Sequence, residues 1–124
     1  MTKFALSPHD PRSDGSTRTR FADGFGFEAR VFESDGTAVV AVVGEIDMAT
    51  VGLFRQAIDD ACLYSQQVVI DLADTTFIDS SGLAVVMRAH GELGRGPGAV
   101  VVRAAGAPIT RTFEVSGLGH LIAW

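Results

Sequence analysis

The chain has 124 residues, of which 47% are hydrophobic, and this length and composition predict one folded domain with a substantial core. Its 15 acidic and 10 basic residues give a formal net charge of −5, which argues against a surface for nucleic acid or an anionic membrane. A single cysteine excludes an internal disulfide, and no apolar run approaches the roughly 20 residues of a membrane helix, so we expect a cytoplasmic protein.

The first 24 residues differ in composition from the rest. Pro, Gly, Ser and charged side chains dominate them, and such a segment buries too little apolar surface to offset its ordering entropy. We therefore predict a flexible N-terminal extension over residues 1–24 and a domain over residues 25–124. The nearby aromatic residues are expected to pack in the core or at a sheet edge: Phe21, Phe25, Phe27 and Phe32.

Strand and helix patterns alternate from residue 25 onward. Residues 27–32 alternate in polarity as in a half-exposed edge strand, and Asp35-Gly36 predicts a hairpin turn into the apolar strand 38–43. The pattern then predicts a helix over about 49–63, a buried strand over 67–72 and, after a polar loop, a helix from Ser80 to Gly91 or Gly94. It continues with a strand over 99–103, a short helix at Pro108 ended by Gly117, and a last strand over 121–124.

This order predicts an α/β fold. An N-terminal antiparallel hairpin leads into strand-helix-strand units, whose crossovers make the later strands parallel. We expect a mixed β-sheet with helices packed against it.

The segment between Asp71 and Leu83 is where chemistry is expected. A strand ends in an acidic residue, and a polar loop leads to two serines at a helix start. The simplest interpretation is that Asp79 or Ser80 only caps the helix. A sharper one is that a phosphate on a serine there would meet the N–H groups and positive dipole of the helix N-terminus. Its charge of about −1.5 to −2 would add to Asp79 and to the expected neighbours Asp47 and Asp74, against an acidic or apolar partner surface.

The same segment resembles a known motif. Phe77-Ile78-Asp79-Ser80-Ser81-Gly82-Leu83 resembles the phosphorylation motif of STAS domains in bacterial anti-sigma factor antagonists. Gly44-Glu45-Ile46-Asp47 is similar to the end of their second strand, and Ser116-Gly117-Leu118 to their short helix. The resemblance covers roughly residues 27–124, in the order and with the element spacing of that family.

The resemblance implies a phosphorylation switch rather than an enzyme, with no cofactor. An unphosphorylated antagonist binds an anti-sigma factor that is also a serine kinase and so frees a sigma factor. The kinase then phosphorylates the first serine of the motif, here Ser80, and a phosphatase of the PP2C type resets the switch. Asp47 matches a position of the partner-binding surface, and Asp79, Ser81 and Gly82 flank the acceptor.

Two consequences can be stated as expectations. A side chain in place of Gly82 would crowd a kinase that approaches Ser80. The substitution Asp47→Ala is expected to weaken partner binding with little effect on folding.

The chain departs from the family pattern at two places. The sequence stops at Trp124, before the C-terminal helix that usually follows the last strand, so either that helix is absent or the chain is truncated. Ala84 stands where many antagonists have glycine. Within the family, the alternative is a non-switching scaffold, as in stressosome-type or transporter-linked STAS domains. The intact Asp-Ser-Ser-Gly run favours the switch.

Other classes fit the residues less well. A receiver domain would use Asp71 as an aspartyl-phosphate site, but the only lysine is Lys3. A serine hydrolase lacks Gly-x-Ser-x-Gly, and the glycines of residues 94–98 lack the Lys-Ser/Thr of a phosphate loop. One cysteine and three scattered histidines show no metal-ligand spacing, so Cys62 is expected in the core and His90 and His120 as surface or packing residues.

Overall fold

A computed structural model describes residues 17–94, 99–103 and 105–123. Five strands are present in these ranges: β1 (Thr17–Ala22), β2 (Glu28–Ser34), β3 (Thr37–Ile46), β4 (Val68–Ile78) and β5 (Val100–Arg103). The helical elements are α1 (Val51–Tyr64), α2 (Ser80–Glu92), α3 (Ala107–Val115) and a single 3₁₀ turn, η2 (Gly119–Leu121).

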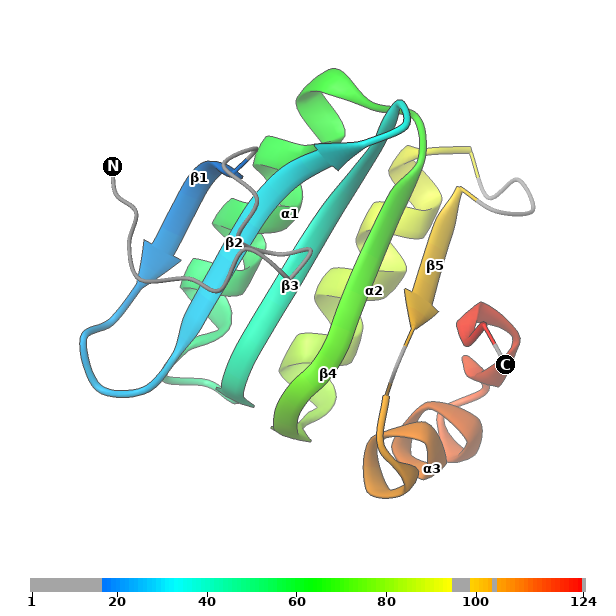
Figure 1. Cartoon of the computed structure of the whole chain (residues 1–124). Coiled ribbons are helices and arrows are strands. Elements are labelled where there is room, and N and C mark those ends of the chain that lie inside the picture. Colours follow the sequence, from blue (N-terminus) through cyan, green and yellow to red (C-terminus); the bar gives the residue numbers. More distant parts are fainter. Residues whose placement is uncertain (1–16, 95–98, 104, 124) are drawn as a thin grey trace.

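The five strands form one sheet in the order β1-β2-β3-β4-β5. β1, β2 and β3 pair antiparallel, and β3, β4 and β5 pair parallel. Figure 1 shows α1 and α2 side by side on one face of the sheet, with α3 beyond β5. The α/β fold with a mixed sheet is thus confirmed.

The main core lies between the sheet and its helices. The largest side chains in it are fully buried, and each contributes roughly 1.5–3 kcal/mol by leaving water: Val31, Val40, Ile70, Phe54, Val86 and Phe113 among them. Phe32, Val39 and Ala41 form a smaller cluster on the other face of the sheet. Phe27 is also buried, as expected, but Phe25 is 93% exposed, which contradicts the prediction for that residue.

The N-terminal prediction is wrong for residues 17–22, which form strand β1 rather than part of an extension. β1 pairs with β2, with Phe21 opposite Ala29, and the Thr19 hydroxyl donates a hydrogen bond to the Asp60 carboxylate of α1. β2 is therefore an interior strand, not the predicted edge strand, and Arg30 is buried in it. Polar side chains alternate along β1 and hide its strand character. The rest of the predicted extension, residues 1–16, lies outside the described residues.

Strand β4 is longer than predicted and replaces the expected polar loop. It continues to Ile78 because its second half pairs with the end of β3, and the Thr75 hydroxyl donates to the Val42 carbonyl oxygen at 2.8 Å. The predicted last strand is reduced to η2 and one bridge between Val102 and Ile122. The predicted hairpin turn is confirmed, with φ of 54° at Asp35 and 81° at Gly36.

Gly44 allows the turn between β1 and β2 to lie against the end of β3. Its φ is +103°, and a Cβ there would stand 2.7 Å from the carbonyl oxygen of Gly26. Both the backbone conformation and the close contact require glycine. This residue therefore lets the turn after β1 contact β3 two residues before that strand ends.

Candidate functional site

The candidate site lies at the edge of the sheet where β3 and β4 end, the lower edge in Figure 1. The two strands are parallel neighbours: Ile46 pairs with Ile78, and the Asp79 amide donates to the Ile46 carbonyl oxygen at 3.1 Å. An aspartate directly follows each strand, Asp47 after β3 and Asp79 after β4. Chain segments more than 30 residues apart thus meet at one edge, at the carboxyl ends of parallel strands.

Helix α2 begins at Ser80 because Asp79 is its N-cap. The Oδ1 atom of Asp79 accepts hydrogen bonds from the amides of Ser81 at 2.9 Å and Gly82 at 3.2 Å, and from the Ser81 hydroxyl. The amide bonds satisfy donors that the first turn of a helix otherwise leaves without partners. The Ser81 hydroxyl, and after it the two amides, lower the pKa of Asp79 below its ordinary value. The cap is therefore a carboxylate at neutral pH.

The two adjacent serines differ in environment. Ser80 is exposed, and its hydroxyl makes no hydrogen bond to any part of the chain that the structure describes. Ser81 is half-buried, and its hydroxyl is held by Asp79. Ser80 is therefore the more accessible hydroxyl of the pair.

Asp47 holds the turn between β3 and α1. Its Oδ1 atom accepts hydrogen bonds from the amides of Ala49 at 2.9 Å and Thr50 at 3.2 Å. The Thr50 hydroxyl donates to the Glu45 carbonyl oxygen at 2.7 Å, which closes the same turn. Because the Asp47 side chain supports the local fold, the expectation that Asp47→Ala leaves folding almost unchanged does not agree with the structure.

We predict instead that Asp47→Ala lowers the free energy of unfolding by about 1 kcal/mol, the usual net contribution of a hydrogen bond of this kind. Asp47→Asn retains an acceptor oxygen and should stay close to the wild type. Urea titration of the three proteins measures the difference. Equal midpoints for Asp47→Ala and the wild type would contradict a structural role for the carboxylate. In partner binding, Asp47→Asn is then the variant that removes only the charge.

Gly82 is buried, and the reason for glycine there is packing. A Cβ at this position would stand 2.6 Å from Cγ2 of Ile46 and 2.7 Å from Cγ1 of Ile78. The missing side chain lets the first turn of α2 lie directly on the ends of β3 and β4. The structure thus gives a different reason from the predicted one, since a side chain at Gly82 would meet the core before it met an approaching kinase.

The structure does not bring Asp71 to the site. Asp71 is buried in the first half of β4 and pairs with Arg103 at 3.5 Å. It lies seven residues before Ile78, which is roughly 23 Å along a strand. The exposed Asp74 lies four residues before the end, roughly 13 Å away, so it is not a direct neighbour of the serines. The receiver-domain alternative also loses its acceptor, because Asp71 does not end a strand.

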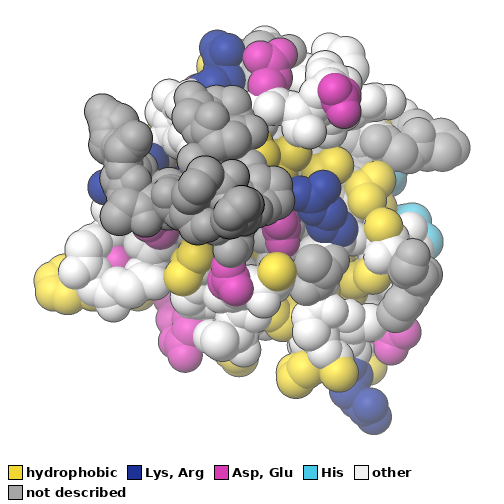
Figure 2. Space-filling view, in the orientation of Figure 1, with side chains coloured by type: hydrophobic (Ala, Val, Ile, Leu, Met, Phe, Trp, Pro, Cys, Tyr) yellow, Lys and Arg dark blue, Asp and Glu magenta, His cyan; other side chains and the backbone are white. Residues whose placement is uncertain are grey.

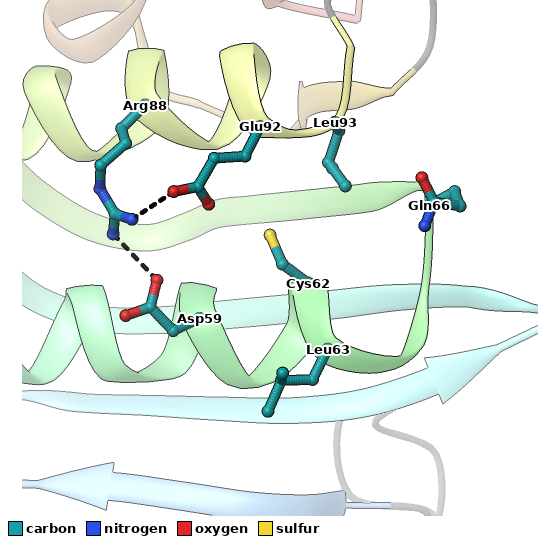
Figure 3. Close-up of a pocket in the computed structure, with 7 residues that line it drawn as sticks. All are labelled: Asp59, Cys62, Leu63, Gln66, Arg88, Glu92 and Leu93. Carbon is teal, nitrogen blue, oxygen red and sulfur yellow. Dashed lines mark hydrogen bonds and ion pairs between the residues drawn. The ribbon is translucent and has the colours of Figure 1, made fainter.

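A cavity of about 450 Å³ lies between α1 and α2, toward their C-terminal ends and away from Ser80 (Figure 3). Seven residues line it: Asp59, Cys62, Leu63, Gln66, Arg88, Glu92 and Leu93. Asp59 and Glu92 hold the Arg88 guanidinium at 2.9 and 2.8 Å. Burial, and after it the charges of Glu92 and Asp59, raises the pKa of the Cys62 thiol. The lining therefore offers neither an unpaired cation for an anionic ligand nor a reactive thiolate.

The remaining predictions from the sequence concern a metal site, a membrane helix and the roles of the histidines. Among these residues, no three His, Cys, Asp or Glu side chains are grouped as ligands for a metal ion. No helix within them is long and apolar enough to cross a membrane. The rings of His90 and His120 pack edge to face with centroids 6.1 Å apart, in agreement with their expected packing role.

Comparison with known proteins finds relatives over most of the chain. A family model described as "Mlab, STAS domain" matches residues 29–123. An anti-sigma F factor antagonist from Paenibacillus polymyxa is 31% identical over 85 residues, which are 67% of this chain and 73% of that protein. The crystal structure of an anti-sigma factor antagonist from Mycobacterium paratuberculosis is 33% identical, with a TM-score of 0.67 over 74% of this chain and 79% of that one. The unphosphorylated antagonist SpoIIAA shares the fold, with a TM-score of 0.67 and 23% identity over 77% of this chain and 85% of that one.

Proposed function

The chain belongs to the STAS domain family, and we propose that it is an anti-sigma factor antagonist controlled by phosphorylation of Ser80. Unphosphorylated, it binds an anti-sigma factor that is also a serine kinase, and a sigma factor is released. The kinase transfers the γ-phosphoryl group of ATP to the Ser80 hydroxyl, ADP leaves and the complex dissociates. A PP2C-type phosphatase restores the serine, and the cycle runs in the cytoplasm. Two relatives named as anti-sigma factor antagonists, 31% and 33% identical, support the antagonist role.

The observation that carries the switch is the position of the Ser80 hydroxyl. It is exposed at the first residue of α2, beside the Asp79 cap and at the same edge as Asp47. A phosphate there would sit at the positive end of the helix dipole, which stabilises negative charge by roughly 0.3–1 kcal/mol at an exposed position. The domain itself would therefore tolerate the modification.

The complex with the anti-sigma factor/serine kinase would not tolerate a phosphate on Ser80. Phosphate adds about −1.5 to −2 charges to an edge that already carries Asp47 and Asp79. In an interface that packs around the neutral hydroxyl, no cation is placed to face the added phosphate, and an uncompensated charge buried there costs about 3–5 kcal/mol. A cost of that size raises a dissociation constant by more than about 100-fold, enough to separate a complex.

Mass spectrometry after incubation with ATP and the anti-sigma factor/serine kinases of the source organism tests the proposal. We expect one phosphate on Ser80 and none on Ser81, because the Ser81 hydroxyl is held by Asp79. Ser80→Ala should abolish the modification, and the matched variant Ser81→Ala should retain it. Phosphate confined to another residue, or none with a kinase that binds the chain, would exclude the switch.

A further inference from the structure

Large apolar side chains are exposed at the same edge of the sheet as Ser80. Seven large hydrophobic residues in the described ranges are exposed, and four belong to this edge: Phe25, Val43, Met48 and Phe77. Phe25 is 93% exposed and Met48 83%, so neither contributes appreciably to the core. Exposed aromatic and methionine side chains at one edge of a domain are typical of a protein-binding surface.

Three neighbouring turns build this edge, and each begins with an aspartate directly after a strand. Asp23 follows β1, Asp47 follows β3 and Asp79 follows β4. In each turn Oδ1 accepts a hydrogen bond from the amide two residues further along, at 2.7, 2.9 and 2.9 Å respectively. The turn that holds Phe25 also lies against Gly44 near the end of β3. The turns are therefore contiguous. We call this region the strand-end surface, and it consists of residues 23–27, 47–50 and 79–80 together with Val43, Glu45 and Phe77.

The strand-end surface is acidic as well as apolar. It carries four carboxylates, those of Asp23, Glu45, Asp47 and Asp79, and no Lys or Arg. All hydrogen bonds that the structure shows for the Asp47 and Asp79 carboxylates end on Oδ1, so Oδ2 of each stays open to a donor from outside. Figure 2 shows acidic and hydrophobic side chains near one another at the lower left of the molecule.

Resting on the proposed function, we propose that the anti-sigma factor/serine kinase docks on the strand-end surface, with Phe25 and Met48 as its apolar anchors. The matching kinase surface has an apolar pocket bordered by Lys or Arg. Anchors of this kind supply most of the binding energy of an interface, and the opposite charges around them speed association and fix the orientation. Phosphorylation of Ser80 then places its charge inside the docked surface.

Two other occupants fit the charges less well. In a symmetric dimer of this chain, the same carboxylates would face their own copies across the two-fold axis, and like charges so placed cost several kcal/mol. A membrane with anionic lipids would repel the same carboxylates. A basic protein surface is the occupant that the four carboxylates favour.

Calorimetric titration of the full chain with the kinase that binds it most tightly tests the proposal. Phe25→Ser and Met48→Ser should each weaken binding at least about tenfold, which corresponds to 1.4 kcal/mol. Leu63→Ser is the matched control, because Leu63 is 84% exposed but lies at the opposite end of α1. It should bind within about twofold of the wild type. All three variants should keep the melting temperature of the wild type, because the side chains they replace are exposed.

The outcomes separate this proposal from the proposed function. If Ser80→Asp abolishes binding while Phe25→Ser and Met48→Ser bind like the wild type, the docking surface is wrong and the switch stands. If the anchor variants lose binding but Ser80→Asp does not, the switch is wrong and the surface stands. Failure of every kinase to bind the wild-type chain overturns both. Self-association that Met48→Ser abolishes would identify a second copy as the occupant and overturn the docking proposal.

Discussion

Ser80→Asp should weaken binding of the chain to its anti-sigma factor/serine kinase at least about tenfold, and Ser80→Ala should leave the dissociation constant within about threefold. The exposed Ser80 hydroxyl makes no hydrogen bond within the described residues, so its loss costs the fold little. A carboxylate in its place adds charge beside Asp47 and Asp79, in partial imitation of a phosphate. Surface plasmon resonance with immobilised kinase measures both constants.

Ser80→Asn is the matched control, since asparagine has the size of aspartate without the charge. We expect it to bind much more tightly than Ser80→Asp, because only the aspartate buries an uncompensated charge in the interface. Equal losses for both variants would point to a steric effect and contradict the electrostatic argument. Wild-type affinity for Ser80→Asp would instead support the non-switching scaffold.

Gly82→Ala should destabilise the fold by about 1–2 kcal/mol, although alanine is the better helix former. A new Cβ 2.6 Å from Ile46 and 2.7 Å from Ile78 overpacks the contact between α2 and the strand ends, typically at a cost of about 1–3 kcal/mol. Helix propensity offsets up to about 1 kcal/mol of this. Thermal and urea unfolding measure the net effect, and in a domain of this size 1 kcal/mol corresponds to roughly 4–8 °C.

Gly52→Ala is the control for that substitution. Gly52 occupies the first turn of α1, as Gly82 does in α2, and a Cβ there would meet nothing within 4 Å. It should stabilise the protein by about 0.5–1 kcal/mol through helix propensity alone. If the two variants shift stability equally, the packing argument is wrong. Wild-type stability of Gly82→Ala together with lost phosphorylation of Ser80 would restore the original expectation that a side chain there obstructs the kinase.

Features that depend on neighbours in the chain were predictable. The start of α2 is an example, because an aspartate before two serines and an apolar stripe is a local capping signal. The hairpin turn at Asp35-Gly36 is another, since positive φ at both central residues suits this pair. The sequence also placed Asp47 among the expected neighbours of Asp79, although it ended the strand before Asp79 too early, at residue 72.

Features that depend on residues far apart in the chain could not be predicted from the sequence. Strand β1 has little apolar character, and only pairing with β2 and the bond from Thr19 to Asp60 make it part of the sheet. The second half of β4 reads as a polar loop until the end of β3 is placed beside it. The same extension moves Asp71 away from the strand end and out of the site.

By itself, the sequence determined the composition class and the mixed α/β order, because these follow from residue content, short-range periodicity, capping and turn chemistry. The motif around Ser80 was identified by its resemblance to the STAS family. Only the tertiary structure decided that Gly82 serves packing, that Asp47 supports a turn, and that Phe25 and Met48 are exposed at one edge of the sheet. Burial and exposure depend on which distant segments cover a side chain. In this protein, strand pairing and helix packing, rather than residue type, determine which side chains are buried.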